Sequence, residues 1–136
     1  MAFVTMVKLA IRADAFERFT TMPTYAALIY SQDVDWTQPE HAAAGEGYAE
    51  FGAAAAAVLR GGTALYPTST ATTVRVKGGS GGDIVTTDGP YAETKDALTG
   101  FYILECADLD EAIATAALIP GAWRGAVEVR PTIPMG

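Results

Sequence analysis

The stretch from Thr72 to Glu105 reads TTVRVKGGSGGDIVTTDGPYAETKDALTGFYILE and contains the signals that decide the fold. Its first six residues alternate apolar and polar side chains, which predicts a half-buried strand over 72–77. Glycines dominate residues 78–82, which we expect to form a hairpin loop before a return strand over 83–87. A longer run of β-forming residues predicts another strand over 98–105. The stretch therefore predicts a β-hairpin followed by a strand of a larger sheet.

The residues before this stretch predict one strand, one helix and a short second strand. Apolar and β-forming residues over 24–30 are typical of a central strand. Aromatic and aliphatic residues at helical spacing predict a helix over 37–60, with Gly61 and Gly62 as its C-terminal stop. A short strand is then expected over 64–66.

The residues after the stretch predict a second helix and a last strand. Asp108 and Glu111 have the spacing of a capping box, which opens a helix. Its buried face is expected to hold Leu109, Ile113, Ala116 and Ala117. Pro120 and Gly121 should end this helix, and the final strand is expected over 127–130.

The order of elements is β-α-β, a hairpin, then β-α-β, which predicts an α+β fold, a ferredoxin-like βαββαβ arrangement with an inserted β-hairpin. We expect two parts of the chain, an N-terminal extension over 1–22 and one domain over 23–136. In the extension, the apolar spacing fits a helix and a strand equally well. Two helices cover only one face of such a sheet, so a second copy of the chain is expected on the bare face, giving a homodimer.

Composition excludes several classes of function. The chain of 136 residues carries 16 acidic and 9 basic residues, a formal net charge of -7. This balance disfavours direct binding to nucleic acid or to an acidic membrane surface. No apolar run reaches the length of a membrane span, and charged residues interrupt any secretory signal, so we expect a cytoplasmic location.

Metal, cofactor and nucleophile chemistry is also disfavoured. The chain has one cysteine, Cys106, and one histidine, His41, so neither a disulfide nor a zinc site with these ligands is expected. Acidic neighbours raise the pKa of the Cys106 thiol, which disfavours a nucleophile. The glycines at 78–82 lack the features of a phosphate-binding loop. We expect no cofactor.

The sequence Thr-Asp-Gly-Pro-Tyr-Ala-Glu-Thr-Lys at 87–95 resembles the signature of the DGPF-type branch of the YCII-related family. The strands over 100–105 and 128–131 resemble two further segments of that family. The resemblance implies a dimeric α/β-barrel and, for some members, a link to an alternative sigma factor. The wider family's proposed catalytic histidine falls near residues 48–51 here. His41 lies about two turns earlier, so that chemistry is not carried over.

Candidate site residues cluster around the signature. Asp88 is the candidate catalytic residue, because a carboxylate at a strand end can act as a general base, although Asp-Gly-Pro also forms turns. The candidate ligand-binding residues are Tyr91, Glu93, Lys95, Tyr102 and Arg130. For Arg130, an internal ion pair with Asp88 or Glu93 and a clamp on a ligand carboxylate are both open.

Two functions follow from these residues. The first is a dimer that binds a small polar or aromatic molecule in a cleft at the signature loop, with or without turnover. The alternative is a non-catalytic accessory protein of a sigma factor, whose acidic surface at 105–111 would meet a basic face of the partner. Glu93 and Lys95 could serve a dimer contact as well as a ligand.

Overall fold

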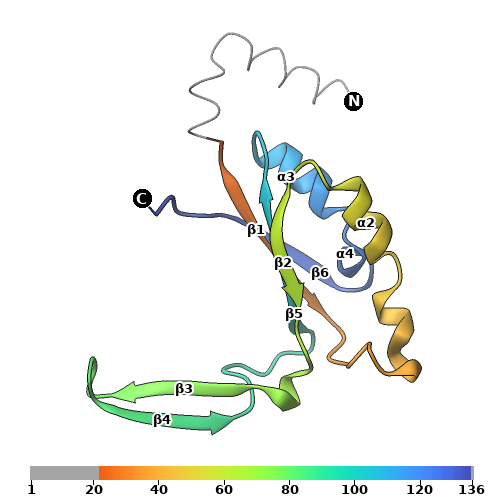
Figure 1. Cartoon of the computed structure of the whole chain (residues 1–136). Helices are drawn as coiled ribbons and strands as arrows, with labels where there is room; N and C mark the ends of the chain where they lie inside the picture. The colour runs from red at the N-terminus through yellow and green to blue at the C-terminus, as the bar shows by residue number, and fades with distance from the viewer. Residues whose placement is uncertain (1–21, 136) are drawn as a thin grey trace.

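The computed structural model describes residues 22–135 and shows a four-stranded antiparallel sheet (Figure 1). The strands stand in the order β2-β5-β1-β6. Their bounds are Thr24–Ser31 for β1, Leu59–Ala64 for β2, Ala97–Glu105 for β5 and Ala126–Pro131 for β6. The strands predicted over 24–30, 98–105 and 127–130 are thereby confirmed. The order matches a ferredoxin-like fold, in which two βαβ units interleave their strands.

Among residues 22–135, the helices cover one face of this sheet and leave the other face without helical cover (Figure 1). They are the 3₁₀ segment η1 (Pro39–Gly45) and the helices α2 (Tyr48–Ala54), α3 (Leu109–Ala116) and α4 (Pro120–Arg124). The core lies between the helices and the sheet. Its buried members are Tyr25, Ala27, Ile29, Phe51, Ala55, Leu104, Cys106, Ala112, Ala116 and Ile119.

The alternation of β1 shows which side chains face the helices. Tyr25, Ala27 and Ile29 are buried, whereas the residues between them are only partly buried. Because side chains alternate along a strand, Leu28 and its register partner Phe101 lie on the face without helices. That face therefore carries apolar side chains that no helix within residues 22–135 covers.

The predicted helix over 37–60 is wrong. The chain instead forms η1, a break at Glu46 and Gly47, and the short helix α2. Gly47 has φ +93°, a left-handed conformation that breaks a continuous helix. Gln38 is the N-cap residue of η1 and makes no side-chain capping bond, while the preceding Thr37 hydroxyl donates to Asp35.

The glycines expected to end that helix lie inside β2, which also replaces the strand predicted over 64–66. Gly62 has φ +140°, and a Cβ atom there would lie 2.3 Å from the carbonyl oxygen of Phe101. Glycine is therefore needed for the close approach of β2 to β5, rather than for a helix end.

The predicted capping box of α3 is confirmed, but its predicted buried face is partly wrong. The Asp108 side chain accepts a hydrogen bond from the Glu111 N–H, and the Glu111 carboxylate accepts one from Ala107. Ala116 is buried as expected. Leu109 and Ile113 are 48% and 51% exposed, and Ala117 is exposed. Their places in the core are taken by Ala112 and Thr115.

Pro120 and Gly121 do not end α3 but begin α4. The chain turns after Ala116 through residues 117–119, and Pro120 then occupies the first turn of the next helix. Proline is well suited to that position because its missing N–H would have no partner in the helix.

Strands β3 (Thr72–Lys77) and β4 (Asp83–Asp88) pair with each other as a separate two-stranded sheet, with the short 3₁₀ turn η2 (Thr68–Thr70) before them. They extend away from the four-stranded sheet on the side without helices (Figure 1). Val76 pairs with Ile84, and both are exposed, Ile84 at 74%. A two-stranded sheet alone is marginal in water, so these apolar side chains lack the cover that such a hairpin needs.

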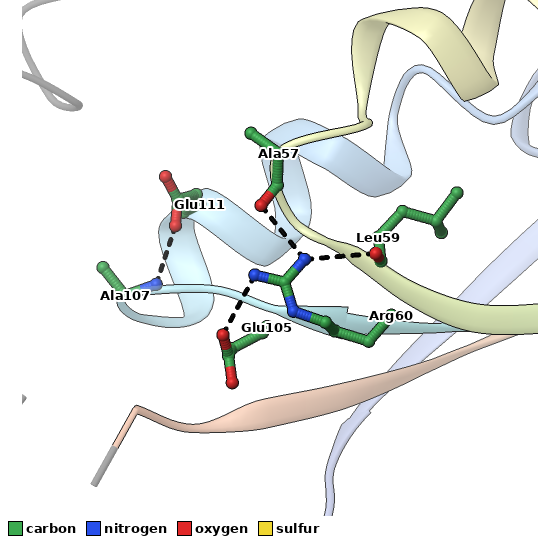
Figure 2. A network of polar contacts seen from close by, with 6 residues as sticks. All are labelled: Ala57, Leu59, Arg60, Glu105, Ala107 and Glu111. Atoms are coloured by element: carbon green, nitrogen blue, oxygen red, sulfur yellow. Dashed lines mark hydrogen bonds and ion pairs between the residues drawn. The ribbon is translucent and has the colours of Figure 1, made fainter. Parts of the chain in front are cut away.

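Arg60 at the start of β2 joins this edge strand to the end of β5 (Figure 2). Its guanidinium donates to the carbonyl oxygens of Ala57 and Leu59, both at 3.1 Å. It also forms a 3.0 Å ion pair with Glu105. The planar fork thereby ties the turn after α2 to the sheet.

Among residues 22–135, no helix is both long and apolar enough to cross a membrane.

Candidate functional site

A cavity of about 220 Å³, which we call the inner cavity, lies between the sheet and the η1–α2 segment. Its aromatic walls are Trp36, Tyr48 and Tyr102. The rings of Trp36 and Tyr48 stack with centroids 5.7 Å apart and planes at 23°. Gly45 makes room for this arrangement, since a Cβ atom there would lie 2.1 Å from the Trp36 ring.

The polar groups of the inner cavity fall into two kinds. The hydroxyls of Ser31 and Thr99 satisfy each other at 2.7 Å. The Tyr102 hydroxyl and the Gln32 side-chain amide, in contrast, form no hydrogen bond with any residue in 22–135. Burial raises the pKa of Tyr102, and the nearby Tyr48 raises it further. A neutral hydroxyl that is free to donate and accept is therefore available to a ligand.

No charged side chain lines the inner cavity. A charged group placed there would lose its hydration without gaining a counterion. The cavity is thus suited to a neutral, flat group. Its volume exceeds the roughly 150 Å³ of an apolar cavity known to accept a single benzene ring.

A second cavity of about 270 Å³, the outer cavity, adjoins the first. The two share Ser31, Gln32, Ala44 and Tyr48 as lining residues. The outer cavity adds charged and titratable side chains, namely Glu40, His41 and Arg124.

The Arg124 guanidinium is held in place by backbone carbonyls. It donates to Ala44 at 3.0 Å and to Glu46 at 2.9 Å, at the end of η1. Within residues 22–135 it forms no ion pair, since the two salt bridges there involve Arg60 and Arg130. Burial raises the pKa of Tyr48, while the positive charge of Arg124 opposes this shift.

The signature loop lines a different pocket. This signature-loop pocket of about 830 Å³ contains Tyr91 and Glu93 together with Tyr30, Tyr66 and Leu98. Tyr91 is 78% exposed, and the Arg75 guanidinium lies 5.2 Å from its ring centroid. The pocket is a wide, largely apolar surface depression, in contrast to the inner cavity.

The structure brings together some of the predicted site residues and separates others. Tyr91 and Glu93 share the signature-loop pocket, whereas Tyr102 lines the inner cavity. Asp88 and Lys95 are exposed and line none of these three spaces. The Asp88 side chain forms no hydrogen bond within the described part of the chain.

Arg130 lies far from the signature within one chain. It faces Ala26 across β6 and β1, and Ala26 faces Ile103. Ile103 lies six residues along β5 from Ala97, where the strand begins just after the signature. Six residues of an extended strand span about 20 Å. The carboxylate partner of Arg130 is Glu128 on the same strand. Neither Asp88 nor Glu93 pairs with Arg130 among residues 22–135, and the clamp on a ligand carboxylate stays a prediction.

Several residues of the two adjoining cavities were not predicted from the sequence. Trp36 and Gln32 lie in a polar connector, and Arg124 follows a proline and a glycine that were interpreted as a helix end. His41 is half-buried and lines the outer cavity. A tryptophan in a short polar connector was the one usable signal, because such a side chain seldom lies fully in solvent.

Metal and thiol chemistry find no support in the described residues. Among residues 22–135, no group of three or more potential ligand side chains is placed to hold a metal ion. Cys106 is fully buried. Burial, and then the charge of Glu111, raises its pKa to about 11, so the thiol is neutral at physiological pH.

The fold and the two cavities define an α+β domain with an internal space between its sheet and its helices. The chain belongs to the YCII-related domain family, whose model matches residues 16–136. The match begins within the expected N-terminal extension. A curated relative, an uncharacterized protein of Rhizobium meliloti (strain 1021), is 46% identical over 69 residues. This similarity covers 49% of the present chain and 53% of the relative, so the chain spans about half the length of the relative it matches.

Proposed function

We propose that this protein binds a small, flat molecule in the inner cavity. One observation carries the proposal: aromatic walls line a space in which the hydroxyl of the half-buried Tyr102 has no partner within residues 22–135. Buried or half-buried polar groups are normally hydrogen-bonded, so unpaired groups in a cavity are available to a ligand.

The site differs from the one expected at the signature loop. The signature-loop pocket is broad and its aromatic residues are exposed, whereas the inner cavity is narrower and lies beneath η1. Of the candidate residues, only Tyr102 contributes to the inner cavity. We assign Tyr91 and Glu93 to a contact with a second copy of the chain.

The proposed homodimer covers the sheet face that the helices leave open. Leu28 and Phe101 lie on that face. The β3–β4 hairpin, which carries the exposed Val76 and Ile84, extends on the same side (Figure 1). Burying this apolar surface in a partner would offset its cost in water. Sedimentation should give a dimer for the wild type and a monomer for Leu28→Lys. The exposed Leu109→Lys variant is the control and should remain a dimer.

We also propose the DGPF-type branch of the family, on the nine-residue signature at 87–95. The accessory role beside a sigma factor rests on the resemblance alone. It becomes the preferred proposal if the inner cavity binds no small molecule.

The test is native mass spectrometry on gently purified, untagged protein. We expect a bound small molecule in the wild type and its loss in Ala44→Leu, because Ala44 lines both cavities and a larger side chain fills them. Ala42→Leu is the matched control, since Ala42 is an exposed neighbour on η1 that lines neither cavity. An adduct that persists unchanged in Ala44→Leu would contradict the proposed site.

A further inference from the structure

We infer that the ligand is an aromatic acid, with its ring in the inner cavity and its carboxylate in the outer cavity beside Arg124. This inference rests on the proposed function and names the chemical class of the ligand. It depends on the contrast between two adjoining spaces that share Ser31, Gln32, Ala44 and Tyr48.

The inner cavity selects the neutral end of the ligand. Its lining holds three aromatic rings and no charged side chain. An ionised group there would remain largely desolvated and unpaired, which disfavours its binding. A planar ring beside Trp36 and Tyr102 gains apolar burial, and a polar ring substituent gains a hydrogen bond from the Tyr102 hydroxyl.

The outer cavity selects the charged end. Arg124 lines it, and two backbone carbonyls fix the guanidinium without neutralising it. A guanidinium has five N–H donors, so this arrangement leaves donors for a carboxylate. Because the fork is already held by Ala44 and Glu46, little side-chain entropy is lost when an anion binds.

Glu40 lies in the same cavity and opposes an anionic ligand. Both Glu40 and Arg124 are exposed, so water and salt screen the charges of both side chains. Arg124 is anchored by two hydrogen bonds, whereas the Glu40 carboxylate forms no hydrogen bond within residues 22–135. An anion beside the anchored guanidinium therefore gains directed hydrogen bonds, whereas Glu40 opposes it only through a screened charge.

The experiment compares phenylacetate with its neutral analogue phenylacetamide by isothermal titration calorimetry on the full chain. We expect the wild type to bind phenylacetate at least tenfold more tightly at low salt, with the ratio falling as ionic strength rises. Arg124→Gln should remove this preference, and Arg124→Lys should retain part of it. Glu40→Gln should strengthen phenylacetate binding two- to threefold without changing the affinity for phenylacetamide.

The outcomes separate the inference from the proposed function. Equal affinity for both probes in the wild type would overturn the aromatic acid and leave the inner cavity as a neutral-ligand site. A preference for phenylacetate that survives Arg124→Gln would overturn the role of Arg124. Phenol is titrated as a third probe. If phenylacetate, phenylacetamide and phenol all fail to bind, the proposed function fails as well. Since Arg124 also holds the end of η1, the melting temperature of each variant is measured, and the wild-type and Glu40→Gln results stand if Arg124→Gln does not fold.

Discussion

The rings of Phe51 on α2 and Tyr102 on β5 lie with centroids 4.9 Å apart and planes at 46°. Phe51 is 2% exposed and belongs to the hydrophobic core. Tyr102 packs against that core while its hydroxyl forms no hydrogen bond within residues 22–135. The contact therefore fixes a polar group at the edge of the core, where it lines the inner cavity.

Tyr102→Phe tests this hydroxyl. The ring contact with Phe51 is retained, so the free energy of unfolding should change by less than about 1 kcal/mol. Affinity for phenol should fall five- to tenfold, corresponding to about one hydrogen bond. Calorimetric titration with phenol measures the affinities of the wild type and of Tyr102→Phe. Tyr66→Phe removes a hydroxyl from the signature-loop pocket instead and should leave binding unchanged. The reverse pattern would move the site to the signature loop.

Gly62→Ala tests the close approach of β2 to β5. Residue 62 has φ +140°, and the added Cβ atom would lie 2.3 Å from the Phe101 carbonyl oxygen. Together these should destabilise the fold by about 2 kcal/mol or more. Gly61→Ala is the matched control, since a Cβ atom there meets nothing within 4 Å. Urea unfolding compares the two variants. Equal stability would show that β2 is not held against β5 in this way.

Asp108→Ala tests the N-cap of α3. Loss of the bond from the Glu111 N–H should lower the free energy of unfolding by about 1 kcal/mol. Asp110→Ala removes a carboxylate from the same first turn without removing the cap, so its effect should be a few tenths of a kcal/mol at most, about that of a dipole contact. Chemical denaturation of both variants provides the comparison, and a larger loss in Asp110→Ala would argue against the cap.

Cys106 predicts a pH dependence in alkali. Burial raises its pKa from 9.0 to about 11, so the folded state retains the proton over a range in which the unfolded state loses it. The contribution to stability is complete below pH 9 and is lost as the pH rises through about 11. Between these pH values, the free energy of unfolding should fall more steeply with pH for the wild type than for Cys106→Ala. The same pH dependence in both proteins would contradict the raised pKa of Cys106.

The strands β1, β3, β5 and β6 were predictable because each shows its pattern locally. The alternation in 72–77 and the apolar run in 24–30 match β3 and β1 within one residue. The helix over 37–60 failed because helical spacing of residues such as Tyr48 and Phe51 says nothing about the turn at Gly47. The strand propensity of Leu59–Ala64 is low, and only pairing with β5 makes it a strand.

The site was harder to predict than the fold because its residues are distant in sequence. Trp36, Tyr48 and Tyr102 come from a connector, a helix and a strand, and only tertiary packing brings them around one cavity. The binding site was predicted at the signature, residues 87–95, because that sequence pattern is distinctive. A distinctive pattern can form a protein interface as well as a ligand site. The high exposure of Tyr91 is compatible with both roles.

A crystal structure of the protein soaked with phenylacetamide tests the location of binding. We predict density for the ring between Trp36 and Tyr102, with the ring substituent within hydrogen-bond distance of the Tyr102 hydroxyl or the Gln32 amide. The signature-loop pocket should hold no ligand. Density beside Tyr91 and Tyr66, with the inner cavity empty or filled by protein side chains, would contradict the proposed site.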